Sequence, residues 1–223
     1  MNNDKNLPTQ SSVSTRNENF FQYAPLIGVI LVLSGLLWFL YQRLRADWIP
    51  TLIPFLISLV LILFGITRKK VWWTVGGLIT LGAGTALFLL ASNVIRGETS
   101  ILLGLTFLSN FIAWLLVFAV IWIMKKTLPW WALFVSFGFA ATAIIFFTKS
   151  SSLLEVIFII SIAEGIVFLL WGFTRAEIGF IIPGALLGTI AAGVYFAWNN
   201  PTTPGNLQKT GVMLVWFALG WGL

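Results

Sequence analysis

The sequence predicts an all-α integral membrane protein: a polytopic transmembrane helix bundle of seven full helices and a partial eighth, built from repeated two-helix hairpins. Three observations lead to this prediction. The chain is 59% hydrophobic and 9% charged, its apolar residues fall in runs of membrane-spanning length, and a basic turn between two such runs recurs along the chain. Because soluble domains carry about 25% charged residues, most of this chain must have lipid as its solvent.

The apolar runs define the expected helices. A helix rises about 1.5 Å per residue, so crossing the hydrocarbon core takes about 20 apolar residues. We expect full helices at residues 24–41, 48–66, 71–91, 101–124, 129–148, 152–173 and 177–198. The last run, residues 211–223, is too short to cross a bilayer, and we expect it to be a helix truncated before its final turns.

The residues before the first apolar run are rich in Asn, Ser, Thr and Gln. Such a segment buries too little apolar area to offset the entropy of ordering. We therefore predict a disordered polar N-terminal tail at residues 1–22 and a transmembrane helical domain at residues 23–223. No small-residue cleavage site follows the first run, so we expect that helix to stay in place as an anchor.

Basic residues gather in the tight turns between apolar runs. Placing the N-terminus in the cytoplasm puts eight of the 13 Lys and Arg residues inside, in the direction of the positive-inside rule. We therefore expect a multi-pass protein of the cell inner (plasma) membrane with a cytoplasmic N-terminus. The residues of the cytoplasmic basic turns are Arg68, Lys69, Lys70, Lys125, Lys126 and Arg175. Tryptophans near helix ends are expected to form an interfacial belt: Trp48, Trp72, Trp73, Trp122, Trp130, Trp131, Trp171 and Trp198.

The chain repeats itself at a shift of 107 residues. Gly65, Thr67 and Arg68 match Gly172, Thr174 and Arg175, so the expected second and third helices are echoed by the sixth and seventh. The shift crosses an even number of helices, and the two copies therefore have the same orientation in the membrane. We predict a parallel internal repeat, unlike the inverted repeats of many transporters.

Two stripes of small residues at a spacing of four are expected to be helix-packing surfaces. One lies on the third expected helix and the other on the seventh. Small side chains let two helices approach closely in lipid; a glycine-lined substrate path is the alternative interpretation. The residues of the two stripes are Gly76, Thr80, Gly84, Gly184, Gly188 and Ala192.

Glu164 is the candidate functional residue, because it lies near the middle of an apolar run. A charged residue at the centre of a bilayer costs about 2.5 kcal/mol or more, and such residues tend to face the protein interior and to be functional. The alternative is a neutral Glu164 that is hydrogen-bonded to a Ser or Thr of a neighbouring helix. Asn110 is the other deep polar residue and is expected to hydrogen-bond across helices.

The composition also excludes several kinds of chemistry. The chain has no His and no Cys, which excludes disulfides, thiol catalysis, His-ligated metals and a His general base. Glu155 and Glu164 are two and a half helical turns apart and point to opposite sides. We therefore predict no catalytic residue, no cofactor, no metal and no enzymatic activity.

The expected partner is the lipid bilayer. The basic residues lie in short gaps between apolar runs, whereas a nucleic-acid surface needs a contiguous basic patch. We therefore expect no nucleic acid to bind. The sequence leaves open whether the protein forms a homo-oligomer or binds another membrane protein.

The stretch from Pro129 to Arg175 combines a Trp-rich helix start, a helix with a central glycine and a basic turn. Over residues 120–198 these features resemble the short membrane repeat of HdeD-type bacterial acid-resistance proteins. The Trp-led apolar helices are also similar to the membrane segments of LiaF-type envelope-stress proteins. The resemblance implies a bacterial inner-membrane protein and carries over no catalytic residue, and this chain has more helices and a longer polar tail than the first family implies.

Three functional hypotheses follow. The first is a non-enzymatic bacterial inner-membrane protein connected with envelope stress. The second is a small-solute or proton-coupled transporter that uses Glu164. The third is a membrane-embedded enzyme, which would need a second acid within reach of Glu164.

Overall fold

The computed structural model describes residues 14–222 except for 47, 93–97, 151 and 200–204. The described residues are helical with no strand, and the predicted all-α class is confirmed. Six of the helices are long and apolar enough to cross a membrane. The helices are α1 (Ser14–Leu44), α2 (Leu52–Thr67), α3 (Val71–Ala91), α4 (Thr99–Lys125), α5 (Trp130–Thr148), α6 (Leu153–Arg175), α7 (Ile178–Trp198) and α8 (Asn206–Gly222).

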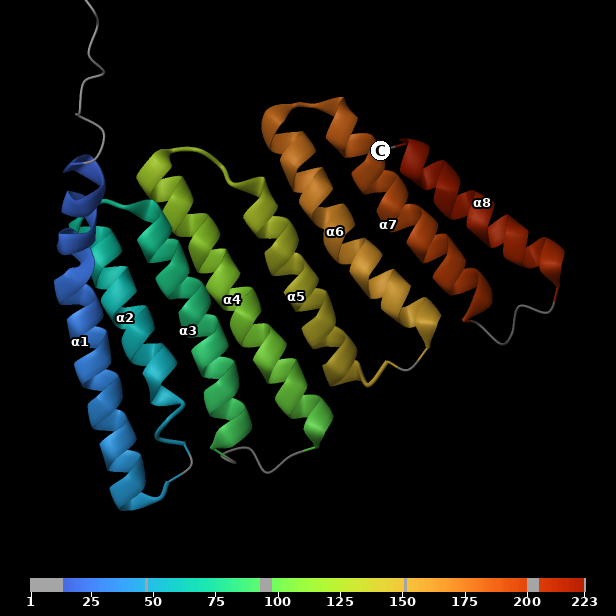
Figure 1. The fold of residues 1–223 in the computed structure, drawn as a ribbon. Helices are drawn as coiled ribbons and strands as arrows, with labels where there is room; N and C mark the ends of the chain where they lie inside the picture. Colours follow the sequence, from blue (N-terminus) through green and yellow to red (C-terminus); the bar gives the residue numbers. More distant parts are fainter. Residues whose placement is uncertain (1–13, 47, 93–97, 151, 200–204, 223) are drawn as a thin grey trace, which may run out of the picture.

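The helices run alternately up and down in a row that is one helix thick (Figure 1). Each helix packs against its neighbours in the chain, and within the described residues no other pair of helices is in contact. The short turns α2–α3, α4–α5 and α6–α7 lie at one end of the row, which we call the basic end (residues 68–70, 126–129 and 176–177). The connections from α1 to α2 and from α5 to α6 lie at the opposite end.

The helix boundaries differ from the expected ones at three places. Helix α1 begins at Ser14, inside the segment predicted to be a disordered tail; the rest of that tail, residues 1–13, lies outside the described residues. Helix α8 begins at Asn206, so its first turn is polar. Helix α2 begins only at Leu52, after Pro50, and its 16 residues make it shorter than the six candidate spans.

The turns after α2 and α6 have the same backbone geometry. Lys69 and Ala176 both have a φ of 53°. The N–H of Lys70 donates to the carbonyl of Gly65 over 2.8 Å, and the N–H of Glu177 donates to the carbonyl of Gly172 over 3.0 Å. This bond from the residue after the left-handed position back to the last helical turn is the Schellman motif. All three pairs of positions are separated by the shift of 107 that the sequence shows.

Glycines let the two helices of these hairpins touch backbone to backbone. A Cβ added to Gly77 would lie 2.8 Å from the carbonyl oxygen of Ser58, and one added to Gly184 would lie 3.0 Å from the carbonyl oxygen of Gly165. Real Cβ atoms essentially never come closer than 3.0 Å to another heavy atom, and a Cβ on Gly184 would also lie 2.9 Å from the backbone nitrogen of Leu169. The α2–α3 and α6–α7 contacts are therefore equivalent and both exclude a side chain.

The predicted stripe on α3 is wrong in its register. A Cβ on Gly76 would have no atom within 4 Å, whereas Gly84 lies against Pro54 of α2. The hydroxyl of Thr80 donates to the carbonyl of Gly76 over 2.7 Å, within its own helix. A spacing of four drifts around a helix of 3.6 residues per turn, and the surface that meets α2 contains Gly77 instead of Gly76.

On α7 the predicted stripe does lie in a helix contact. Gly184 packs against α6. A Cβ added to Gly165 of α6 would lie 3.4 Å from the backbone nitrogen of Gly188. Ala192 is buried. Helix α7 lies between two neighbours, α6 and α8. A groove of about 210 Å³ among these helices is lined by all three residues of the stripe, so the glycine-lined path stays an alternative there.

Aromatic side chains fill the contacts of α6 with its two neighbours, α5 and α7, near the basic end. The Trp130 ring stacks on Trp171 with centroids 5.7 Å apart, and Trp171 stacks on Phe180 at 4.0 Å. Trp130 is only 6% exposed. The expectation that Trp130 anchors the protein at the interface is therefore wrong, because its ring packs between helices. Trp72, at 64% exposure, agrees with an interfacial position.

Adjacent glycines on α3 provide a stability test. We expect Gly77→Leu to destabilise the protein by about 1–3 kcal/mol, as overpacking of a close contact does, because its side chain would meet Ser58 and Ile62. Gly76→Leu is the matched control, since its side chain would enter open space. Thermal unfolding in detergent measures both variants. Equal unfolding temperatures for the two would contradict the assigned register.

Candidate functional site

Glu164 lies near the middle of α6 and faces α5. A Cβ on Gly138 of α5 would be 3.5 Å from Oε1 of Glu164. The missing side chain at Gly138 therefore leaves the space in which the carboxyl group lies. The sequence prediction that Glu164 faces another helix, and not lipid alone, agrees with this position.

The carboxyl group of Glu164 forms no ion pair with the described part of the chain. Its Oε2 is buried without a hydrogen bond. Thr142, one helical turn after Gly138 on α5, donates its hydroxyl to the carbonyl of Gly138 over 2.8 Å. The alternative hydrogen bond from Glu164 to a neighbouring Ser or Thr is therefore not observed among these residues. A buried polar atom left unpaired is costly. Among the described residues, Glu164 is the one carboxyl group with such an atom; the other four are hydroxyl or indole groups, of Thr74, Ser92, Trp130 and Trp171.

A lateral groove of about 330 Å³ opens beside this carboxyl group. Gly138, whose backbone faces Oε1 of Glu164, lines the groove. Ile160, one helical turn before Glu164, lines it as well. The remaining lining residues are Phe107, Val135, Phe139 and Thr142. Glu164 is not itself among the lining residues, and its carboxyl group lies behind Gly138 of the groove wall. A carboxyl group in this position suits the transfer of a proton or a single hydrogen bond if the wall opens.

Asn110 is not brought together with Glu164. Its Nδ2 donates to the carbonyl of Thr106 over 2.9 Å within α4, and a Cβ on Gly82 of α3 would lie 3.2 Å from its Oδ1. Asn110 thus packs in the α3–α4 contact, and Glu164 lies in the α5–α6 contact. Its expected hydrogen bond across helices is not observed. Two serines beside it do bond across helices. The hydroxyl of Ser136 donates to the carbonyl of Phe111 over 3.1 Å, and that of Ser109 donates to the carbonyl of Gly82 over 3.5 Å.

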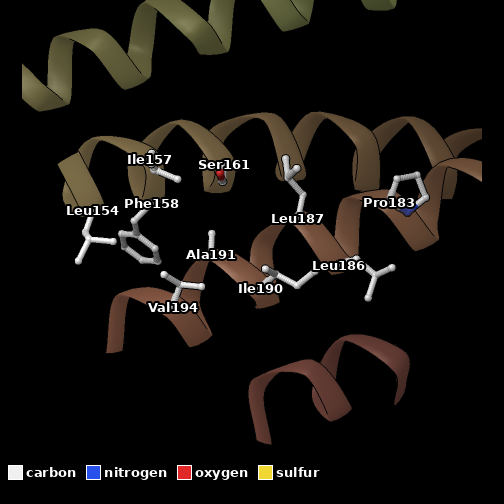
Figure 2. A pocket seen from close by; sticks show the side chains of 10 residues that line it. All are labelled: Leu154, Ile157, Phe158, Ser161, Pro183, Leu186, Leu187, Ile190, Ala191 and Val194. Carbon is white, nitrogen blue, oxygen red and sulfur yellow. The ribbon is translucent and has the colours of Figure 1, made fainter. Parts of the chain in front are cut away.

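A second groove, of about 440 Å³, lies between α6 and α7 and was not predicted from the sequence (Figure 2). Ser161 is the single hydroxyl among its lining residues, and Phe158 and Pro183 also contribute to its wall. The other lining side chains are aliphatic. A groove of this composition fits a hydrocarbon chain and offers no charged group to a polar ligand. The sequence signal was the pair of residues unusual in an apolar helix, Ser161 and Pro183.

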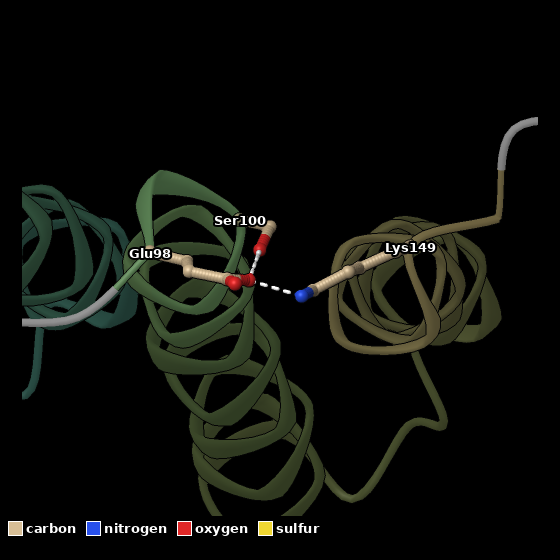
Figure 3. Close-up of polar contacts among 3 residues, drawn as sticks. All are labelled: Glu98, Ser100 and Lys149. Atoms are coloured by element: carbon tan, nitrogen blue, oxygen red, sulfur yellow. Dashed lines mark hydrogen bonds and ion pairs between the residues drawn. The ribbon is translucent and has the colours of Figure 1, made fainter.

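The described residues contain an ion pair between Glu98 and Lys149 at the end of the row opposite the basic end (Figure 3). Lys149 follows α5, and Glu98 immediately precedes α4. Glu155 stays in the first turn of α6, where its N–H donates to Oγ of Ser152 over 3.2 Å, as an N-cap requires. The hydrogen bond from Lys149 and its positive charge lower the pKa of the Glu98 carboxyl group below its usual value.

The predicted basic turns are exposed and share the basic end. The ammonium group of Lys125, at the end of α4, lies 5.0 Å from the centre of the Trp72 ring at the start of α3. This cation–π contact connects two neighbouring turns. The positions of the turns at one end agree with the alternation that the sequence predicts.

The fold and these sites define a class: a multi-pass integral membrane protein, with isolated polar groups between its helices. Among the described residues no group of three or more Asp and Glu side chains is placed to hold a metal ion. Comparison with known proteins does not narrow the class, because no protein-family model, no curated protein and no solved structure matches this chain.

The Glu98–Lys149 pair predicts a dependence of stability on pH. Because the pKa of Glu98 is lower in the folded protein than its ordinary 4.5, the pair stabilises the fold above that value, and this contribution is lost as the pH falls through the lower, folded pKa. Both side chains are exposed, so the effect should be small. We expect wild type to unfold at a slightly higher temperature than Lys149→Met at pH 6, and the gap to narrow as the pH is lowered from 4.5 through the folded pKa of Glu98. A gap that stays constant across this range would contradict the pairing.

Proposed function

We propose that the protein is a non-enzymatic component of a bacterial inner membrane, connected with envelope stress, whose row of helices offers binding surfaces within the bilayer. The observation that carries this proposal is the separation of its polar groups. Asn110 and Glu164 lie in different helix contacts, and Lys149 pairs with Glu98 at the exposed end. Acid–base and nucleophilic catalysis need two groups within hydrogen-bond reach in one site, and this arrangement favours binding over catalysis.

The proposed architecture is a parallel repeat of hairpins with the N-terminus in the cytoplasm. Equivalent turns at Lys69 and Ala176 and equivalent glycine contacts at Gly77 and Gly184 support the repeat. The clustering of basic turns at one end supports a cytoplasmic location for that end. The connection with stress rests on the resemblance to HdeD-type and LiaF-type proteins.

A deletion strain tests the role in stress. We expect loss of the gene to reduce growth in acid, detergent or cell-wall antibiotics and to leave growth in rich neutral medium unchanged. Normal growth under all three stresses would exclude the stress role.

A cysteine substitution tests the proposed cytoplasmic location of the basic end. The wild-type chain has no cysteine, so Ala176→Cys introduces a single thiol at a basic turn. An impermeant thiol reagent should fail to label this thiol in intact cells.

A second candidate function is proton-coupled transport through Glu164. The specific observation in its favour is the buried, unpartnered Oε2 of a carboxyl group whose Oε1 faces Gly138, a residue that lines an open groove. A carboxyl group in such a position can take up and release a proton as a solute enters and leaves. The groove opens sideways, so this function requires either a movement of α5 relative to α6 or a partner that closes the groove.

Reconstituted liposomes test this second function. We expect wild type to move protons together with a small solute, and Glu164→Gln to lose coupled flux while unfolding at a similar temperature. Glu155→Gln is the matched control on the same helix, because Glu155 lies in the first helical turn. Equal flux in wild type and Glu164→Gln would remove Glu164 as the coupling group.

A further inference from the structure

A groove of about 350 Å³ lies between α1 and α2 and reaches the basic end. Val29 of α1 lines its apolar part together with Val60 and Phe64 of α2. Thr67 and Arg68 line it where α2 ends. Between Val60 and Arg68 a helix rises about 12 Å, at 1.5 Å per residue. The groove is therefore apolar along its depth and cationic at its mouth.

Arg68 offers its guanidinium group at this mouth. Its central carbon lies 5.9 Å from the centre of the Phe64 ring, which is a cation–π contact with the wall of the groove itself. Arg68 is exposed and forms no ion pair within the part of the chain that the structure describes. The described carboxyl groups all belong to α4, α6 or α7, or to the residue before one of these helices: Glu98, Glu155, Glu164 and Glu177. The charge of Arg68 is thus left for an anion from outside these residues.

The corresponding place between α5 and α6 is filled by side chains. The residues 107 positions after Val60 and Phe64 are Val167 and Trp171. Val167 is fully buried, and the Trp171 ring lies edge-on to Phe134 of α5 with centroids 6.0 Å apart. Val60, in contrast, is only partly buried. The α5–α6 contact therefore has packed aromatic rings where the α1–α2 contact has a groove.

The difference comes from α1, which carries smaller side chains than α5 at the matching positions. Ile27 corresponds to Phe134, and Ile30 corresponds to Phe137. Ile27 is 44% exposed and is not among the residues that line the groove. Lipid tails are as apolar as a Leu side chain, so an acyl chain can occupy between α1 and α2 the space that rings occupy between α5 and α6.

We propose that this groove binds one anionic phospholipid, with its phosphate group on Arg68 and an acyl chain along Val60 and Val29. The planar guanidinium group of Arg matches the oxygens of a phosphate group, and Lys69, which is exposed in the same turn, adds a second positive charge. The groove between α6 and α7 is larger but has no charged residue in its wall, so the combination belongs to the α1–α2 groove. The proposal gives a ligand to the binding role proposed above, on which it rests, and does not depend on the connection with stress.

Native mass spectrometry tests the headgroup contact. The protein is taken into mild detergent from bilayers of equal parts phosphatidylglycerol and phosphatidylcholine with the same acyl chains. We expect wild type to retain several-fold more phosphatidylglycerol than phosphatidylcholine, and Arg68→Gln to lose this preference. Arg175→Gln is the matched control, because Arg175 is an exposed residue at the equivalent turn and the contact beside it is filled by Val167 and Trp171. No preference in wild type, or equal losses in the two variants, would overturn the proposal, the latter because it indicates attraction to basic residues in general.

A second pair of variants tests the position of the acyl chain. Val29→Trp would fill the groove from α1, whereas Leu31→Trp would project from the opposite face, since two residues turn a helix by about 200°. Val29 is 49% exposed and Leu31 is 66% exposed, so neither variant should unfold at a lower temperature. We expect Val29→Trp to lose the retained phosphatidylglycerol and Leu31→Trp to keep it.

The same retention in both tryptophan variants would contradict the placement of the chain and with it the proposal. In that case zwitterionic lipid or another protein would be the cover of the groove. These measurements use purified protein and are independent of the growth of the deletion strain. A failure of the lipid site is therefore distinct from a failure of the stress role.

Discussion

The contacts between backbones at glycine are the interaction on which this structure depends. In lipid, apolar side chains gain little by leaving hydrocarbon, so helices associate through close packing and weak polar contacts. Gly77 and Gly184 bring α3 to α2 and α7 to α6 at separations that no side chain would permit. The hairpins formed by these contacts are the rigid units, and the tight turns at Lys69 and Ala176 hold their helices in register.

A row one helix thick has consequences for function. Each helix keeps two faces open, so grooves between neighbours open sideways and not along a central channel. The grooves beside Gly138 and beside Ser161 are both of this kind. The carboxyl group of Glu164 lies behind the wall of one of them, against Gly138 of α5. Such a surface suits a protein that binds lipid, a hydrophobic ligand or another protein within the bilayer.

The sequence alone determined the class, the number and direction of the helices, the basic turns and Glu164 as the polar residue in need of explanation. These properties follow from local composition and from the length a helix needs to cross a bilayer. Tertiary structure decided which glycine forms each contact, as the choice of Gly77 over Gly76 illustrates. It also decided that Trp130 is buried between helices and that Lys149 pairs with Glu98. These outcomes depend on how neighbouring helices are rotated about their axes and on how close they lie, which a pattern along one helix does not specify.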